Sequence, residues 1–281
     1  MTELTVHTAE KFLAFILLGF GTGLYGTLIG AGGGFVLMPI LLLLYPHKNP
    51  EHLTSVSLAV VFFNALGGSE VYALMRRIDY RSGLMFAAAT IPGAVAGALI
   101  TSYVSRSLFD AIFGIALASA SAFLVMRSNV AEEARAVYSR HYHVERHIVF
   151  ADGDQFVYSF NPMMGIGLSF VVGFLSSFLG IGGGIIHVPA LTYLLGFPVH
   201  VATATSHFIL AIMAFAGTLT HIVDGTFGHD VDITLSLAIG VVLGAPLGAY
   251  LSNRIRGNWI VRGLALALGL VGLRMILATL L

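Results

Sequence analysis

The sequence contains no cysteine. This excludes disulfide bonds, thiolate catalysis and cysteine-ligated metal sites together. Charge is also scarce, because only 10% of the 281 residues are Asp, Glu, Lys or Arg, and the formal net charge is zero. No basic cluster therefore points to nucleic acid as a partner.

Apolar residues, in contrast, are abundant. They make up 57% of the chain, and the mean hydropathy is +0.90. Several stretches run for about 18 or more residues without a charge, which is long enough for a membrane-spanning helix. This composition is too apolar for a water-soluble globule and predicts an all-α polytopic membrane protein within the lipid bilayer.

Ten apolar segments are visible, five on each side of a polar linker. The segments are Phe12–Ile29, Phe35–Tyr45, Leu53–Leu74, Ser82–Tyr103, Leu108–Met126, Met163–Leu179, Ile185–Leu195, Val201–Ile222, Ile233–Leu251 and Trp259–Leu280. The second and the seventh have about 11 residues, which as helix rise only about 16 Å, roughly half of a bilayer core about 30 Å thick. Neither can span a membrane alone.

Each short segment follows a glycine-rich break, and the two breaks have the same pattern. Gly30 to Pro39 reads Gly-Ala-Gly-Gly-Gly-Phe-Val-Leu-Met-Pro, and Gly180 to Pro189 reads Gly-Ile-Gly-Gly-Gly-Ile-Ile-His-Val-Pro. Agreement of four glycines and a proline at matching places indicates that the chain is two copies of one unit.

Loop charges predict that the two copies are inverted. Residues 76–81 contain three arginines, whereas the equivalent loop, residues 224–232, contains three aspartates and no Lys or Arg. In the next loop the bias reverses, with Arg106 alone in the first half and three arginines at 254–262 in the second. Under the positive-inside rule, equivalent loops lie on opposite sides. We therefore expect two inverted repeats of about five helical segments, each beginning with a Gly-broken helical hairpin.

This gives three parts: a first transmembrane repeat over residues 1–126, a polar cytosolic linker over 127–162 and a second repeat over 163–281. In the linker, Ala131–Tyr142 is compatible with an interfacial helix, and the β-prone runs around Asp152-Gly153 predict a hairpin. His141, His143 and His147 are a weak metal signal in an aqueous loop without cysteine, so we expect no metal and no cofactor.

Glycine runs inside a membrane serve either close helix packing or a backbone that leaves the helix to meet a ligand. Matching breaks in two inverted halves favour the second use, and each break opens a short helix whose N-terminus attracts an anion. We expect Gly93, Gly97, Gly244 and Gly248 to serve packing. The residues predicted to bind substrate are Gly32, Gly33, Gly34, Thr54, Ser55, Gly182, Gly183, Gly184, Thr205 and Ser206. For the four hydroxyls, helix capping is the competing interpretation.

Two histidines in the second half are candidates for carrying a coupling proton. His187 belongs to the glycine motif, and His207 directly follows Thr205 and Ser206. A histidine titrates near physiological pH, although a purely structural, hydrogen-bonded role is the alternative for each. Asn64 and Glu70 are also polar residues inside an apolar segment. For Glu70 an ion pair with the arginines at 76–81 is an equal alternative.

No enzyme signature is present. The glycines are not followed by Lys-Ser or Lys-Thr and do not follow a strand, which excludes a P-loop and a dinucleotide fold. The sequence also contains no His-Glu-x-x-His and no Gly-x-Ser-x-Gly motif.

Several stretches together resemble one known family over essentially the whole chain. They are Gly26 to Pro39, Gly173 to Pro189, Ala202-Thr-Ala-Thr-Ser206 and Gly244-Ala-Pro-Leu-Gly-Ala249. The chain resembles the TauE/SafE family of sulfite and organosulfonate exporters. Two positions depart from the family pattern: Leu53 stands where a small residue is usual, and His207 where an apolar residue is common.

The resemblance implies a multi-pass permease of the inner (cytoplasmic) membrane for small sulfur-containing anions such as sulfite, sulfoacetate or related sulfonates, coupled to protons. A passive anion channel, or a membrane sensor or assembly protein that transports nothing, would share the same local features. Small-residue helix faces would allow a homodimer, and nothing in the sequence selects one.

Overall fold

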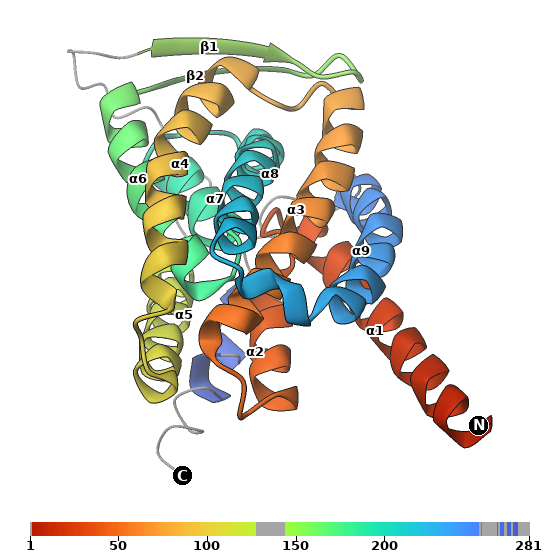
Figure 1. The fold of residues 1–281 in the computed structure, drawn as a ribbon. Helices are drawn as coiled ribbons and strands as arrows, with labels where there is room; N and C mark the ends of the chain where they lie inside the picture. The colour runs from red at the N-terminus through yellow and green to blue at the C-terminus, as the bar shows by residue number, and fades with distance from the viewer. Residues whose placement is uncertain are drawn as a thin grey trace.

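The computed structural model describes residues 2–127 and 144–252, together with positions 254, 263, 265–266, 269–270 and 272–274. The elements, drawn in Figure 1, are α1 Thr2–Leu28, α2 Gly34–Leu44, α3 Pro50–Leu74, α4 Tyr80–Thr101, α5 Arg106–Arg127, β1 Val144–Val149, β2 Gln155–Phe160, α6 Pro162–Leu179, α7 Gly184–Tyr193, α8 Val199–Val223, η1 Thr226–His229 and α9 Val231–Ser252. The expected linker helix Ala131–Tyr142, with His141 and His143, lies outside the described residues, as does most of Trp259–Leu280.

The apolar runs form helices where the sequence predicted them. Each expected segment from Phe12–Ile29 to Ile233–Leu251 coincides with one helix from α1 to α9. A backbone in lipid must satisfy its own hydrogen bonds, so long apolar runs become helices. Among the described residues, six helices are long and apolar enough to cross a membrane, whereas α2 and α7 have only 11 and 10 residues. The chain is an all-α polytopic membrane protein apart from one β-hairpin.

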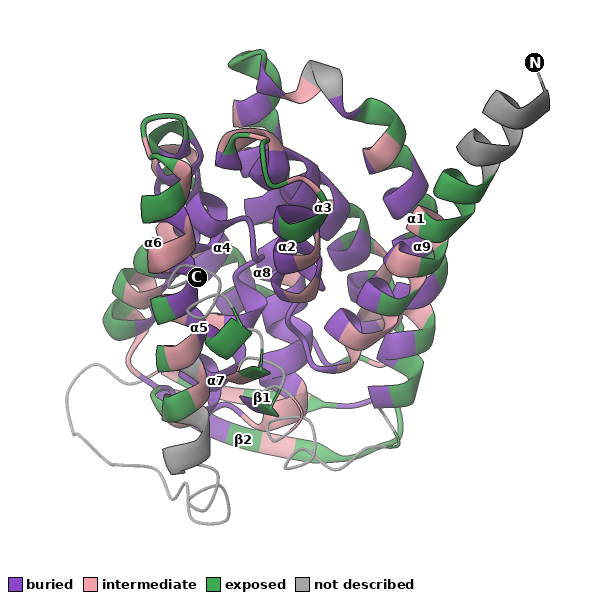
Figure 2. Cartoon of the chain, turned by 90° about the horizontal axis from the view of Figure 1, so that it is seen from below, coloured by how far each residue is buried: buried purple, intermediate pink, exposed green. Residues whose placement is uncertain are grey.

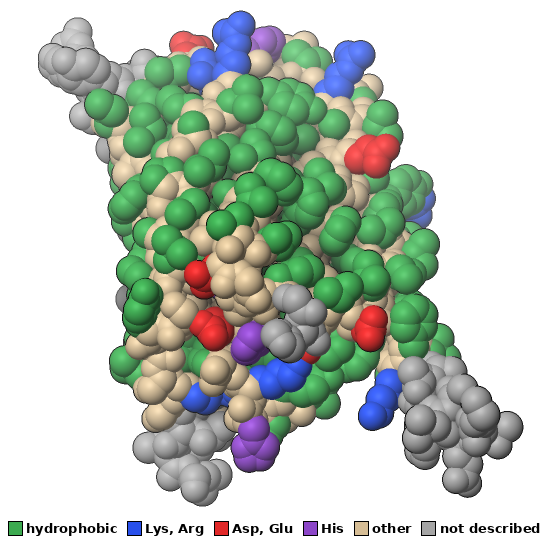
Figure 3. All heavy atoms as spheres, viewed as in Figure 1, with side chains coloured by type: hydrophobic (Ala, Val, Ile, Leu, Met, Phe, Trp, Pro, Cys, Tyr) green, Lys and Arg blue, Asp and Glu red, His purple; other side chains and the backbone are tan. Residues whose placement is uncertain are grey.

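The surface has the layered character of a membrane protein. Hydrophobic side chains cover the broad middle of the face in Figure 3, and charged side chains gather toward its two ends. Large apolar side chains such as Leu17, Phe63 and Leu243 are exposed. The buried residues lie inside the bundle, as Figure 2 shows in a view along it. The exposed apolar band is the surface that faces lipid.

Five helix pairs make the largest contacts among the described residues, and each joins a helix before the linker to one after it: α1 with α9, α4 with α6, α3 with α8, α3 with α9, and α4 with α8. Glycines allow the first two pairs to approach closely. A β-carbon at Gly93 of α4 would lie 2.9 Å from the backbone nitrogen of Phe174, and one at Gly244 of α9 would lie 2.9 Å from that of Leu24. The predicted packing role of these glycines is confirmed.

Strands β1 and β2 form an antiparallel hairpin at the top of Figure 1, with Val144 opposite Phe160 and Val149 opposite Gln155. They lie where the runs around Asp152-Gly153 predicted a hairpin. The Ala151 N–H donates to the carbonyl oxygen of Met75 at 3.1 Å, which attaches the hairpin to the end of α3. We call this end of the molecule the hairpin end.

The two glycine-broken helix pairs enter the bundle from opposite ends. Helix α2 returns from the break to the end away from the hairpin, where Arg106 donates to the carbonyl oxygen of Leu42 at 2.7 Å. Helix α6 starts directly after β2, and α7 returns to the hairpin end, where Phe197 packs on Tyr158 with ring centroids 4.5 Å apart. Each broken pair therefore turns back to the end from which it came.

Candidate functional site

The two glycine breaks lie against each other inside the bundle. A β-carbon added at Gly34 would come 2.6 Å from the carbonyl oxygen of Ile181, and one added at Gly184 would clash with the carbonyl oxygen of Gly30. All of these residues are buried. No side chain fits between the two segments, so backbone meets backbone at the centre of the protein.

Both breaks use backbone conformations that favour glycine, because L side chains rarely adopt positive φ angles. These φ angles are 78° at Gly30, 79° at Gly32 and 76° at Gly33, and then 66° at Gly180 and 72° at Gly182. The middle glycine of the second triplet differs from its counterpart Gly33, because Gly183 has a φ of −62°. The two breaks are similar in path but not identical.

Helices α2 and α7 begin at these breaks, with Gly34 and Gly184 as their first residues. The first-turn N–H groups of a helix have no acceptor within the helix, and its N-terminal end carries partial positive charge. Because each of these two helix starts touches the other break, both present donors to one central region. That arrangement suits a small anion.

Helices α3 and α8 flank the breaks in matching registers. A β-carbon at Gly32 or at Gly182 would contact both Val61 and Leu210, which lie halfway along α3 and α8. Gly180 packs on Thr54, and Gly30 packs on Thr203. The counterpart of Thr54 is therefore Thr203, not Thr205 as the shared Thr-Ser pair in the sequence suggested.

The four predicted hydroxyls have different partners. Those of Thr54 and Ser55 donate to carbonyl oxygens of their own helix, Glu51 at 2.9 Å and His52 at 2.8 Å. The Thr205 hydroxyl accepts the Asp79 N–H at 3.0 Å. The Ser206 hydroxyl is buried and has no hydrogen-bond partner within the described structure. Ser206 is thus the one of the four whose hydroxyl forms no hydrogen bond.

The sequence analysis missed two further hydroxyls beside the breaks. Ser57 donates to the carbonyl oxygen of Gly180 at 2.5 Å. Thr203, against Gly30, has a buried hydroxyl without a partner in the part of the chain that the structure describes. Both residues lie one or two positions from the predicted ones, so the polar cluster was visible in the sequence but its helical register was not.

His187 is held within the second broken pair. Its Nε2 lies 3.1 Å from the hydroxyl of Ser169 on α6, and the side chain is buried. This contact joins α6 to α7 and does not reach the first half of the chain. The geometry favours the structural alternative for this histidine.

His207, in contrast, connects the two halves. Its Nε2 lies 3.2 Å from the hydroxyl of Thr27 on α1, and that hydroxyl donates to Oδ1 of Asn64 on α3 at 3.0 Å. The His207 ring also lies beside the Gly30 backbone and meets the Tyr72 ring edge-on at 5.6 Å. All of these side chains are buried.

The same place in the other half has a leucine instead of the histidine. Gly68 packs on His207 and Thr27, whereas Gly217, its counterpart on α8, packs on Leu58 and Ser177. The register that pairs Val61 with Leu210 also pairs Asn64 with Met213. The arrangement of backbones is repeated, but the polar cluster is not.

Asn64 has an unused donor at this cluster, because its Nδ2 has no hydrogen-bond partner among the described residues. The sequence had identified Asn64 as a polar residue inside an apolar segment. Thr27 gave no such signal, since threonines are common in membrane helices and often bond their own backbone.

A buried aspartate stands before α4 at the hairpin end. Asp79 accepts the hydroxyl of Tyr158 at 2.8 Å and lies 3.4 Å from Nε of Arg146. Its backbone N–H bonds Thr205 of α8. Asp79 thus links the hairpin, through its carboxylate, to α8, through its backbone N–H.

Asp230 holds the equivalent place before α9, at the opposite end, and pairs with Lys48. A pocket of about 320 Å³ opens there, lined by His47, Lys48, Asn49, His52 and Asp230. The two ends therefore share an aspartate with a basic partner, and only one of them carries the hairpin.

A family model described as sulfite exporter TauE/SafE matches residues 15–275. The chain is 32% identical over 272 residues to the probable membrane transporter protein YunE of Bacillus subtilis, which covers 95% of this chain and 97% of that protein. It is 26% identical to a probable membrane transporter protein of Methanocaldococcus jannaschii, with 93% and 94% covered. No solved structure matches.

Proposed function

The chain belongs to the TauE/SafE sulfite exporter family of membrane transporters, and we propose that it moves small sulfur-containing anions across the inner membrane. Its substrates would be sulfite, sulfoacetate or related sulfonates. The observation that carries the proposal is the meeting of two helix N-termini at the buried glycine breaks. Such a site supplies donors to an oxyanion without placing a fixed opposite charge in hydrocarbon.

We propose that the two halves are inverted repeats that rock against each other. Support comes from the helix pairing, because α1 packs on α9 where α6 packs on α4, and from the two broken pairs, which enter from opposite ends. In this scheme the anion lies at Gly32–Gly34 and Gly182–Gly184 while access alternates between the two ends of the bundle.

Polar side chains complete the proposed site. Ser206 and Thr203 have unused buried hydroxyls, and Asn64 offers its free Nδ2 from the other side of the breaks. The hydroxyls of Thr54 and Ser55 already donate to their own helix, so they would bind an anion only after rotating away. Thr205 keeps a donor while it accepts from Asp79.

We assign the coupling proton to His207 in preference to His187. His207, in the second half, bonds Thr27 of the first half, and Thr27 in turn bonds Asn64. A change in the charge of His207 would therefore alter a contact between the halves. The titratable group facing it is Tyr72. An imidazolium at this place would also attract the anion, which couples the two binding events.

The hairpin end is the proposed cytoplasmic side. Arg76, Arg77, Arg81, Arg146 and Arg254 lie there, and the opposite end carries Lys11, Lys48 and Arg106. This asymmetry supports the proposal through the positive-inside rule, and the linker hairpin would then lie in the cytoplasm.

The proposal is tested by flux of labelled sulfite, sulfoacetate and sulfate into proteoliposomes, with and without an imposed pH gradient. Accumulation of sulfite or a sulfonate against its gradient only when the pH gradient is present is the expected result. Downhill flux that ignores the pH gradient would indicate a channel or uniporter. Absence of flux for every sulfur anion would overturn the substrate assignment.

A further inference from the structure

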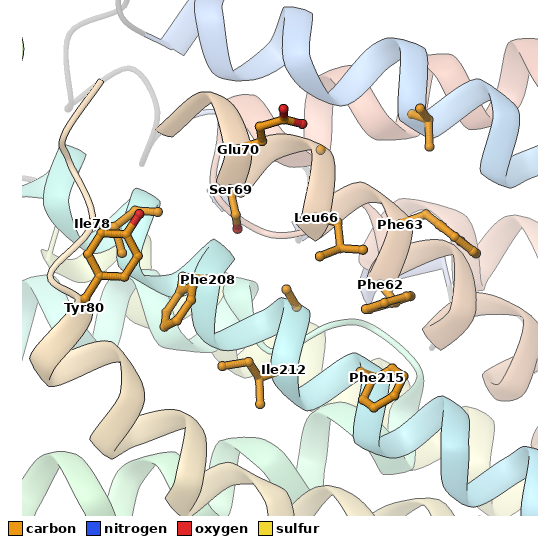
Figure 4. Close-up of a pocket in the computed structure, with 13 residues that line it drawn as sticks. Phe62, Phe63, Leu66, Ser69, Glu70, Ile78, Tyr80, Phe208, Ile212 and Phe215 are labelled. Atoms are coloured by element: carbon orange, nitrogen blue, oxygen red, sulfur yellow. The ribbon is translucent and has the colours of Figure 1, made fainter. Parts of the chain in front are cut away.

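A second cavity lies on the lipid-facing side of the bundle, away from the glycine breaks. This groove has a volume of about 870 Å³ and lies between α3 and α8 (Figure 4). Phe62 and Phe63 of α3 and Phe208 and Phe215 of α8 form much of its wall. Its volume is within the range of about 300–1,000 Å³ that is typical of small-molecule sites.

The end of the groove nearest the hairpin is polar. Glu70 lines it and is exposed. Within the described residues its carboxylate forms no ion pair, so the ion pair with the arginines at 76–81, one of the two alternatives for this residue, is not made. The hydroxyl of Ser69 is buried, at 9% exposure for the residue, and has no hydrogen-bond partner there. Tyr80 also lines the groove, and its ring lies against Phe208, at 5.3 Å between centroids.

The distance between the polar and the apolar end of the groove is close to the thickness of one membrane leaflet. Phe62 lies near the middle of α3, and Glu70 lies one turn before its end at Leu74. The eight residues between them span about 12 Å of helix, close to half of a hydrocarbon core about 30 Å thick. The carboxylate is therefore at head-group depth, and the phenylalanines lie toward the bilayer centre.

We propose that this groove binds a membrane phospholipid whose head group carries a primary ammonium, such as phosphatidylethanolamine. The ammonium would lie at Glu70, and an acyl chain would lie over Phe62, Phe208 and Phe215. An unpaired carboxylate beside lipid is costly and attracts a cation. The same carboxylate repels anionic lipids and the small anions proposed as substrate.

Such a lipid would contact both halves of the protein, because α3 precedes the linker and α8 follows it. It would stabilise the arrangement in which this groove is open between the two helices. The groove would thus let bilayer composition bias the conformation of the protein.

The test uses the full chain reconstituted in vesicles of equal phosphatidylethanolamine and phosphatidylglycerol, extracted gently and analysed by native mass spectrometry. We expect retained phosphatidylethanolamine to exceed phosphatidylglycerol about two- to five-fold, as an ion pair of ordinary strength gives. Glu70→Gln should bring the ratio to about one. Glu145→Gln, the same change at an exposed hairpin residue, should leave it unchanged.

Two further variants separate the alternatives. Leu66→Trp fills the groove and should reduce retention of both lipids, while Glu70→Gln should lose only the preference. Leu66→Cys introduces a single cysteine into a chain that has none, so a disulfide-linked dimer forming in the intact membrane would show that a second copy covers the groove. That dimer, or an unchanged lipid ratio in Glu70→Gln, would overturn the proposal. Neither result bears on anion transport.

Discussion

The hydroxyl of Thr27 and Nε2 of His207 lie 3.2 Å apart, joining a helix that precedes the linker to one that follows it. The equivalent place, where Gly217 packs on Leu58 and Ser177, has no histidine. The backbones of the two halves follow related paths, but the side chains differ at this place, where the halves are in contact. A transporter needs such a difference if protonation is to act on one side of the site only.

Replacing His207 with leucine should uncouple transport from the pH gradient. Leucine occupies the equivalent place at Leu58, so we expect Leu at position 207 to be accommodated in a folded protein. Accumulation in proteoliposomes under a pH gradient should fall to a ratio of about one, while downhill flux continues. His187→Gln is the matched control, since glutamine still reaches a hydroxyl such as Ser169. Loss of coupling in His187→Gln alone would reverse the assignment.

Ser206→Ala should weaken substrate binding without unfolding the protein. The Ser206 hydroxyl has no hydrogen-bond partner in the described structure, so its removal breaks no hydrogen bond there. A lost hydrogen bond to a charged group is worth about 1.5–3 kcal/mol, which predicts a KM at least about tenfold higher in flux assays. Ser55→Ala removes a hydroxyl that bonds only its own helix and should leave KM unchanged. Equal effects of the two substitutions would contradict this site.

The two triplet glycines Gly33 and Gly183 should differ in tolerance to alanine. Gly33 has a φ of 76°, and a β-carbon there would lie 2.6 Å from the carbonyl oxygen of Thr22. Left-handed backbone alone costs an L residue about 1–2 kcal/mol, and the contact adds to it. At Gly183 φ is −62°, and the nearest atom is a methyl carbon of Val172 at 3.1 Å.

Gly33→Ala should therefore lower the thermal unfolding midpoint in detergent by several degrees, and Gly183→Ala should change it little. Because both glycines are at the proposed anion site, stability is the measurement that isolates the backbone effect. Similar losses of stability in the two variants would show that the breaks have the same conformation.

Alkaline pH should destabilise the attachment of the hairpin. Burial, and then the Asp79 carboxylate, raise the pKa of Tyr158 above the value near 10 of an unfolded tyrosine. Below that pH both states keep the proton. Above it the unfolded state loses the proton first, so stability falls by up to about 1.4 kcal/mol per pH unit.

Tyr158→Phe should lose about 1.5–3 kcal/mol at neutral pH, because the bond to Asp79 is removed, and its stability should fall less steeply above pH 10. Chemical unfolding at a series of pH values measures both effects. Tyr103→Phe, at a residue that is 87% exposed, is the control and should match the parent. A parallel pH profile for Tyr158→Phe and the parent would contradict the role of this hydroxyl.

The helices and the hairpin were predictable because their signals are local. In lipid, an apolar run such as Leu53–Leu74 satisfies its backbone hydrogen bonds by forming a helix. Asp152-Gly153 favours a tight turn wherever it lies. The pairs Thr54-Ser55 and Thr205-Ser206 are alike in sequence, but they do not occupy equivalent positions beside the glycine breaks. The contact with Gly30 falls on Thr203 instead.

The sequence by itself determined that this is a helical membrane protein with two matching glycine breaks. The hydrophobicity of a segment and the backbone freedom of its glycines are properties of that segment alone. Only the tertiary structure decided that the breaks touch, that His207 faces Thr27 and Asn64, and that Glu70 lies at the end of a groove. These relationships depend on the rotation and register of packed helices. Packing across the whole bundle fixes that register, and no short stretch of sequence contains it.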